Sequence, residues 1–180
     1  SYSFEKDFIP FMSMPGMRER TITINSFSKN FIMTGWRVGN IIAPAFIVRV
    51  LKDMGENIVY SAPAPSQRAA IYALRNRKVI QPPIIAEYRK RMEYAAERIN
   101  RIPWMSVITP PKGSFYLFIN IKKSGLSSLD AADMILEKAH VLLLPGNAFG
   151  RCGEGYLRLA CTVGVDKLEE AFDRIEKIEL

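Results

Sequence analysis

The hydrophobic and polar positions of the chain mark several short strands. Residues 21–25, TITIN, alternate Thr and Ile, which is the two-residue period of a half-buried strand. Residues 38–44, VGNIIAP, form a short apolar run that a proline closes, which is typical of a buried strand. Turn residues separate four later segments of strand character, which are 106–109, 115–120, 141–146 and 156–161.

Other segments follow a helical period. The clearest is 81–101, where Tyr88, Met92 and Ile99 fall on one stripe and Pro82 and Pro83 suit the first turn. Apolar residues at helical spacing also predict helices over 45–60 and 65–78. A further helix is expected to begin at a cap formed by Ser127 or Ser128 and to run to about His140. The last predicted helix has four apolar residues on one side, which are Val165, Leu168, Phe172 and Ile175.

The order of these elements predicts two parts. Residues 1–80 read as an α/β segment, and residues 81–180 read as a smaller α+β domain that the long linking helix 81–101 enters. Two strands and two helices make a poor sheet by themselves, so we expect the partners of the first part to lie outside these 180 residues. The chain also begins with Ser1 and not Met, which favours a partial chain.

Composition and charge exclude several classes of protein. The net charge is +7, but the basic stretch within 81–101 interleaves glutamates, as on a solvated helix face, and no zinc finger, RNP-type strand or basic arm is present. We therefore expect no nucleic-acid partner. No window approaches the run of about 18 apolar residues that a membrane span needs, and the first residues lack the pattern of a signal peptide.

Cysteine and histidine usage bears on metals and on the compartment. Cys152, Cys161 and the single His140 make neither a metal site nor a disulfide framework, so we expect no metal and a cytoplasmic location. We expect His140 to end a helix and Trp36 to fill the core.

The residues with the most chemical potential lie in SFSKNFIMTGWRVG, residues 26–39. Lys29 follows a strand directly, at the rim of a sheet, where α/β proteins bind ligands. The hydroxyls of Ser26 and Ser28 and the planar guanidinium of Arg37 could together bind a phosphate group. On composition alone, an ordinary loop with a surface lysine and a surface arginine is the favoured interpretation, because one of each at a loop is common.

This stretch resembles the pyridoxal-phosphate lysine signature of class I/II aminotransferases, which combines S-x-S-K with G-x-R-x-G. Three later stretches, PKGSFYLFINI, LLLPGNAFG and GYLRLACT, are similar to landmarks of the small domain of these enzymes and come in the family's order. The resemblance implies an α/β fold, in which residues 1–80 are the remaining part of the fold type I pyridoxal-phosphate (PLP) binding large domain. The smaller α+β domain follows.

The resemblance also assigns roles. Lys29 would form a Schiff base with pyridoxal 5'-phosphate and shuttle a proton, while Ser26, Ser28 and Arg37 would bind the cofactor's phosphate. The expected activity is a PLP-dependent aminotransferase that interconverts an amino acid and a 2-oxo acid, as a homodimer in the complete protein. A PLP-dependent C–S β-lyase and a non-catalytic PLP-sensing domain of a transcription regulator remain alternatives of the same fold.

A second candidate group lies near the C-terminus. In GYLRLAC, Leu157 and Leu159 point one way and Arg158 the other, a pattern that by itself favours an edge strand with a solvated arginine. The resemblance implies that Arg158 binds the α-carboxylate of the substrate and that Asn147 and Phe149 shape the pocket wall.

Two functional residues that the family requires have no counterpart in these 180 residues. The family holds the pyridine nitrogen with an acidic residue and the cofactor's O3' with a tyrosine, in a segment that would precede SYSFEKDF. We therefore expect the chain alone to bind the cofactor poorly and not to turn over. The sequence leaves open which amino acid or 2-oxo acid is the substrate.

Overall fold

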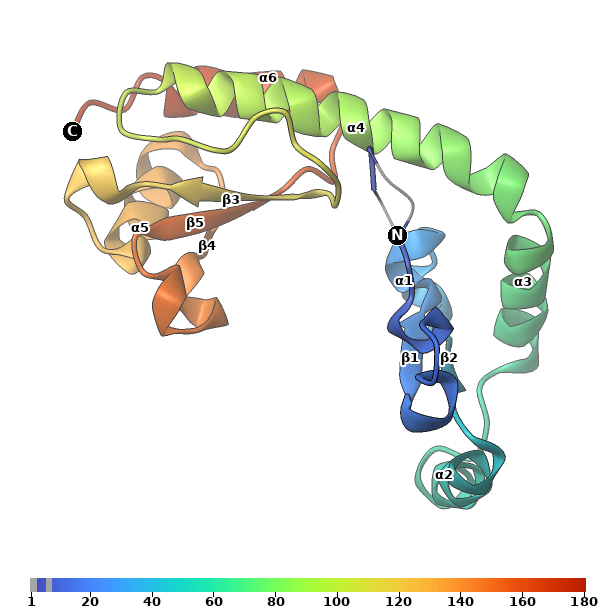
Figure 1. The fold of residues 1–180 in the computed structure, drawn as a ribbon. Coiled ribbons are helices and arrows are strands. Elements are labelled where there is room, and N and C mark those ends of the chain that lie inside the picture. The colour runs from blue at the N-terminus through green and yellow to red at the C-terminus, as the bar shows by residue number, and fades with distance from the viewer. Residues whose placement is uncertain (1–2, 6–7) are drawn as a thin grey trace. The chain divides into compact units, whose positions relative to one another are not determined.

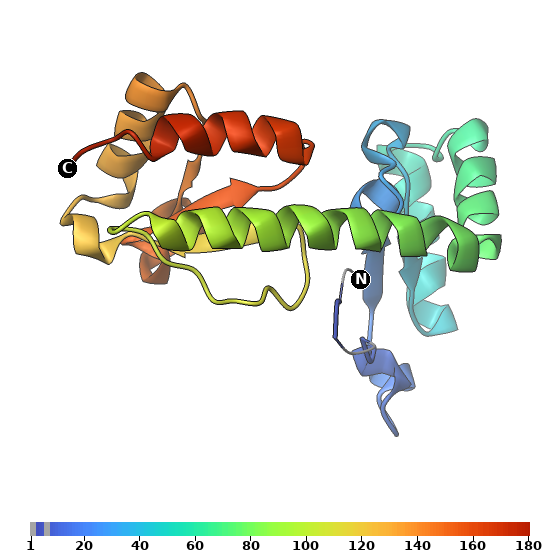
Figure 2. The ribbon, with the colours of Figure 1, turned by 90° about the horizontal axis from the view of Figure 1, so that it is seen from above.

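The computed structural model describes residues 3–5 and 8–180, which form two compact units (Figures 1 and 2). Unit 1 contains the described residues from 8 to 84, and unit 2 contains residues 3–5 and 85–180. The division falls after Ile84, whereas the sequence suggested a boundary at residue 80. Helix α4 (Arg77–Arg101) contributes residues to both units.

Unit 1 is built on a pair of antiparallel strands. Strands β1 (Thr23–Ser26) and β2 (Gly39–Ile42) pair over their full lengths, which confirms the two strands expected there. The remaining elements of unit 1 are the 3₁₀ helices η1 (Phe11–Ser13), η2 (Arg18–Arg20) and η3 (Thr34–Trp36) and the helices α1 (Phe27–Asn30), α2 (Ala45–Ile58) and α3 (Ala64–Arg75).

The core of unit 1 is small. Its buried apolar side chains are Phe27, Met33, Val38, Ala70 and Ala73. Helix α2, all of whose residues the structure describes, has no buried side chain, although its apolar residues recur at helical spacing. The strands likewise expose their isoleucines. Unit 1 therefore leaves apolar surface uncovered, as expected for an incomplete sheet.

Trp36 does not fill the core, contrary to the expectation from the sequence. Its side chain is 47% exposed, because η3 ends there and the backbone turns left-handed at Arg37 before the buried Val38. The core position that we assigned to Trp36 is therefore wrong. The small core of unit 1 closes around Met33 and Val38 instead.

Unit 2 is a three-stranded antiparallel sheet in the order β3-β5-β4 (Figure 1). Its strands are β3 (Tyr116–Asn120), β4 (Leu144–Pro145) and β5 (Tyr156–Ala160), and the 3₁₀ helices η4 (Lys122–Ser124), η5 (Gly146–Phe149) and η6 (Arg151–Gly153) lie in its loops. Leu157 and Leu159 are buried while Arg158 is half-buried, so the alternation expected for β5 is confirmed.

Three helices supply a large part of the core of unit 2. They are α4, α5 (Ser128–Ala139) and α6 (Val165–Ile175), whose apolar stripes contribute Met92, Ile99, Ile135, Leu168 and Phe172. Helices α4 and α6 run side by side (Figure 2), and ion pairs from Arg98 join them. No described helix is both long enough and apolar enough to cross a membrane.

The ends of α5 agree with the sequence pattern. Ser127 is the N-cap, and its hydroxyl oxygen accepts a hydrogen bond from the N–H of Asp130 at 3.1 Å. His140 is the C-cap, in a left-handed conformation, and its N–H donates to the carbonyl oxygen of Leu136. The expectation that His140 ends a helix is confirmed.

Two element predictions are wrong, and a third is only partly right, because the strand expected over 141–146 is confined to β4. Residues 106–109 form only an isolated bridge from Ser106 to Asn120, because the side chain of Asn100 hydrogen-bonds the main chain of Val107 at both N–H and C=O and takes the place of a strand partner. Helix α4 begins at Arg77, not at 81, and Pro82 and Pro83 lie inside it. The proline ring fixes φ near the helical value, so the prolines remain in the helix at the loss of their own hydrogen bonds.

Candidate functional site

The first group of candidate residues lies at one end of the β1–β2 pair. Ser26 pairs with Gly39, and the N–H of Phe27 donates to the carbonyl oxygen of Val38 at 3.3 Å. A Cβ at Gly39 would lie 2.6 Å from the carbonyl oxygen of Asn25, so only glycine allows the strands this close approach. The pairing brings the segment before Gly39 next to the start of α1.

Four polar residues lie on the two segments that this pairing brings next to each other. Ser26 caps α1, and its hydroxyl oxygen accepts a hydrogen bond from the N–H of Ser28 at 3.1 Å. Arg37 donates from Nη1 to the carbonyl oxygen of Thr34 at 2.7 Å, which ties its guanidinium to the η3 turn. Lys29 is exposed on α1. An amine, two hydroxyls and a guanidinium make a donor set that suits a phosphate monoester bearing an aldehyde.

The backbone of the same loop is strained. Ile32 has a φ of 55° and Arg37 a φ of 50°, both in the left-handed region that a β-branched residue such as isoleucine rarely adopts. Such a conformation costs of the order of 1–3 kcal/mol per residue and concentrates at functional sites. The strain thus agrees with a functional role for the segment between Lys29 and Arg37.

The second group of candidate residues lies on the open face of the sheet of unit 2. Arg158 on β5 pairs with Phe118 on β3, and Tyr116 lies two residues along the same strand on the same face. The guanidinium carbon of Arg158 lies 4.6 Å from the ring centroid of Tyr116 and 4.3 Å from that of Phe149. The structure therefore brings Arg158 and Phe149 together.

Phe149 and Asn147 belong to the loop of residues 146–155, in which the backbones of Gly146 and Gly153 approach each other closely. We refer to this segment as the glycine loop. A Cβ at Gly146 would lie 2.2 Å from the carbonyl oxygen of Gly153, and a Cβ at Gly153 would lie 2.0 Å from that of Gly146. Any larger residue would push the two turns of the loop apart.

Glu154 links the glycine loop to α5. Its Oε1 accepts a hydrogen bond from the N–H of Ser128 and its Oε2 one from Nδ2 of Asn147, both at 2.7 Å. The hydrogen bond from the Ser128 N–H, followed by that from Asn147, lowers the pKa of the Glu154 carboxyl against the opposing effect of desolvation. The buried hydroxyl of Ser128 accepts in turn from the N–H of Gly155 at 2.9 Å.

Two residues of this second group were not identified from the sequence. Tyr116 belongs to β3, and the β3–β5 register was needed to place it on the face of Arg158. Glu154 stands between two glycines, a pattern that marks a tight loop but does not name its hydrogen-bond partners. Asn147 engages Glu154 through its amide.

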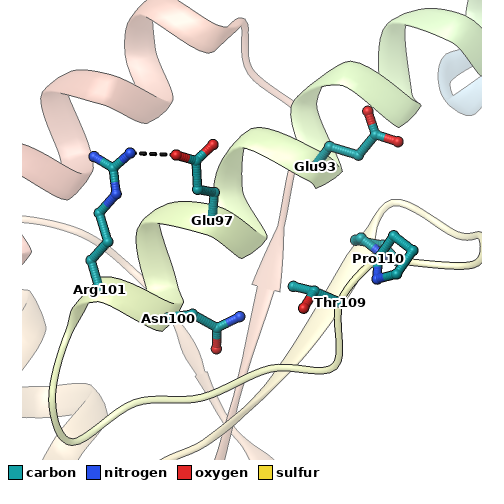
Figure 3. A pocket seen from close by; sticks show the side chains of 7 residues that line it. Glu93, Glu97, Asn100, Arg101, Thr109 and Pro110 are labelled. Carbon is teal, nitrogen blue, oxygen red and sulfur yellow. Dashed lines mark hydrogen bonds and ion pairs between the residues drawn. The ribbon is translucent and has the colours of Figure 1, made fainter.

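A cavity of about 540 Å³ lies elsewhere in unit 2, between α4 and the segment 109–111 (Figure 3). Of the charged side chains that line it, Arg101 pairs with Glu97, as the dashed line in Figure 3 marks, and Glu93 pairs with Arg89. The cavity lining includes none of the candidate residues of either group.

Comparison with known proteins places these features in context. Residues 3–175 match the family described as aminotransferase class I and II. Aromatic-amino-acid aminotransferase 2 of Thermococcus litoralis is 42% identical over 171 residues and an aspartate aminotransferase of Pyrococcus abyssi 42% identical over 172, each alignment covering 92% of this chain and 43% of the relative. The crystal structure of an aromatic aminotransferase from Pyrococcus horikoshii OT3 matches with a TM-score of 0.89 at 36% identity, over 96% of this chain and 46% of that one. The chain thus spans less than half the length of these proteins.

Proposed function

Because the chain belongs to the class I and II aminotransferase family, whose members depend on pyridoxal 5'-phosphate, we propose that it forms part of an aminotransferase that interconverts an amino acid and a 2-oxo acid. The observation that supports the proposal is the pairing of β1 with β2, which brings the segment of Arg37 next to the start of α1, where Ser26, Ser28 and Lys29 lie. When bound, pyridoxal phosphate supplies the electron sink that stabilises negative charge at the substrate Cα.

The residues of unit 1 have separate tasks in this proposal. Lys29 would hold the cofactor through Nζ, and the same amine would carry the proton to and from the substrate Cα. Ser26, Ser28 and Arg37 hold the phosphate, which keeps the reacting carbon at a set place relative to Lys29. Unit 1 is then the remaining part of the cofactor-binding large domain.

Arg158 recognises the substrate in the same proposal. Its planar guanidinium forms two parallel hydrogen bonds with the α-carboxylate of an amino acid or a 2-oxo acid. Asn147 and Phe149 contribute to the wall of this carboxylate subsite. Unit 2 is then the small domain, which supplies carboxylate recognition.

The complete protein acts as a homodimer in the cytoplasm. The apolar residues that unit 1 exposes, among them those of α2, support burial against further polypeptide. The two cysteines are free thiols, Cys152 exposed and Cys161 buried, which suits a reducing compartment. Light scattering coupled to size-exclusion chromatography of the complete protein measures the oligomeric state directly.

Reductive trapping tests the role of Lys29. The chain is joined, as one polypeptide, to the preceding half of a family member, loaded with pyridoxal phosphate and reduced with borohydride. Peptide mapping then measures the labelled fraction of each lysine. We expect label at Lys29 and little at Lys52, which is exposed on α2 and paired with Glu56. Equal labelling of the two lysines would remove the basis for the assignment of Lys29.

Spectroscopy of the same protein tests the reaction. A panel of L-amino acids should bleach the yellow cofactor band, and a 2-oxo acid should restore it. The amino acids that respond identify the substrate. Release of ammonia and pyruvate while the band persists would instead indicate a C–S β-lyase.

A further inference from the structure

The guanidinium of Arg158 contacts two aromatic rings from separate elements. Tyr116 belongs to β3 and Phe149 to η5, at distances of 4.6 and 4.3 Å from ring centroid to guanidinium carbon. Both distances are well inside the range of about 6 Å over which a cation is attracted to an aromatic face. We refer to Tyr116 and Phe149 as the aromatic pair.

Contact with ring faces constrains the orientation of the guanidinium plane. Its flat faces stack on aromatic rings, while its N–H groups point outward in its own plane. A carboxylate binds in that plane through two parallel hydrogen bonds. The aromatic pair can therefore hold the plane of Arg158 without occupying the edge that a carboxylate needs.

The hydrogen bonding of Arg158 also favours the binding of a carboxylate. Its Nε is buried and has no hydrogen-bond partner among the described residues. A buried donor without a partner is unfavourable, and a carboxylate oxygen at the guanidinium edge would remove that penalty. Arg98 offers a contrast within unit 2, because its Nε donates to Glu176 at 2.7 Å.

Each ring of the pair is itself supported. The main-chain N–H of Tyr116 donates to the hydroxyl of Ser114 at 3.2 Å, and its ring lies 4.1 Å from that of Phe115. Phe149 belongs to the glycine loop, which Glu154 ties to α5 through its hydrogen bonds to Asn147 and to Ser128. The pair is thus attached to the sheet on one side and to a tightly packed loop on the other.

We propose that Tyr116 and Phe149 are positioning residues, whose ring faces hold the guanidinium of Arg158 in the orientation that accepts a carboxylate. This inference rests on the proposed function of Arg158, and it adds Tyr116 to the substrate subsite. It also assigns Phe149 a task that differs from lining the pocket wall. The tyrosine hydroxyl is not needed for this task, so a phenylalanine at position 116 serves equally well.

Nuclear magnetic resonance of the 180-residue chain tests the proposal. The Nε–Hε cross-peak of Arg158, identified by its loss in R158K, is followed during titration with sodium acetate at constant ionic strength. Sodium chloride at equal concentration is the control for a spherical anion. In the wild-type chain we expect an upfield Hε position, caused by the two rings, and a saturable shift with acetate.

The variants separate the rings from other features of the sheet. Y116L and F149L should each weaken acetate binding about two- to fivefold, the change expected from loss of one cation–π contact. Y116F should bind within twofold of wild type. F118L is the matched control, because Phe118 is the cross-strand partner of Arg158 on the same face but stacks on Tyr156. Thermal unfolding of each variant checks that unit 2 stays folded.

The outcomes distinguish the inference from the proposed function. If acetate binds at Arg158 equally well in wild type, Y116L and F149L, the positioning role is wrong and the carboxylate role of Arg158 stands. If acetate leaves the Arg158 cross-peak unmoved in the wild-type chain, the carboxylate role fails and the inference fails with it.

Discussion

Removal of the Arg98 guanidinium should destabilise unit 2 far more than removal of a comparable charge on the same helix. The Arg98 side chain is only 8% exposed on α4. Its Nη2 donates to Asp173 of α6, its Nε to Glu176, which is the C-cap of α6, and its Nη1 to the hydroxyl of Tyr94, each at 2.7 Å. The hydrogen bond to Glu176 is the main reason that the pKa of Arg98 is raised above its ordinary value.

The expected loss for Arg98→Met can be worked from these contacts. The Asp173 side chain is 59% exposed and regains water in the variant, so its pair contributes below about 1 kcal/mol. Glu176, at 33% exposed, loses a charge-assisted hydrogen bond worth about 1.5 kcal/mol. Cation–π contact with Phe172 adds about 0.5–1 kcal/mol. Together these contacts predict a loss of about 3 kcal/mol.

Urea-induced unfolding measures this loss. Trp104 is buried in unit 2, whereas Trp36 belongs to unit 1, so a Trp36→Phe background restricts the tryptophan fluorescence to unit 2. The matched control is Arg101→Met, because Arg101 lies on the same helix in an exposed pair with Glu97. Its expected cost is about 0.3–0.5 kcal/mol.

The comparison of the two variants tests whether the ion pairs of Arg98 stabilise unit 2. If Arg98→Met lowers the free energy of unfolding by less than about 1 kcal/mol, or by no more than Arg101→Met, the ion pairs between α4 and α6 do not stabilise unit 2 as argued.

Three further predictions concern the glycine loop, the glycines and the thiols. The folded-state pKa of the Glu154 carboxyl is lowered, so the ionised carboxylate stabilises the fold at pH values above its unfolded pKa of about 4.3, and this stabilisation is lost as pH falls through the folded pKa. Between pH 5 and 3 the wild-type chain should therefore lose more free energy of unfolding than Glu154→Gln. Equal losses in the two proteins would contradict this prediction. Gly146→Ala should destabilise by more than about 2 kcal/mol in thermal unfolding, whereas Gly55→Ala in α2, where an added Cβ meets no atom within 4 Å, should be neutral or stabilising. Burial raises the pKa of Cys161 to about 12, so a thiol reagent at pH 8 should modify exposed Cys152 alone until denaturant is added, and rapid reaction of two thiols would refute this.

The element boundaries show where local patterns are sufficient. The alternation around Arg158 and the cap at Ser127 follow from the residue types of a few consecutive positions, and both are confirmed. The segment 106–109 has the same strand character but lacks a ladder, because Asn100 takes the main-chain groups of Val107. Asn100 lies seven residues before Val107, and strand propensity carries no information about it.

Some features of the candidate site could likewise be predicted from the sequence, and others could not. The residue types around Lys29 sufficed for the family assignment, and with it for the role expected of Arg158, because a signature of residue types at set spacing is contained in the sequence itself. The strain at Ile32 could not be read in this manner, since it depends on how the loop closes between two paired strands.

What the sequence by itself determined is therefore the order and type of most elements, the family, and the candidate chemistry of Lys29 and Arg158. Only the tertiary structure decided that Tyr116 and Phe149 meet the guanidinium of Arg158, and that Glu154 joins the glycine loop to α5. The physical reason is the range of the interactions. Backbone period and capping act within a few residues, whereas strand register and loop packing are set by contacts between residues far apart in the chain.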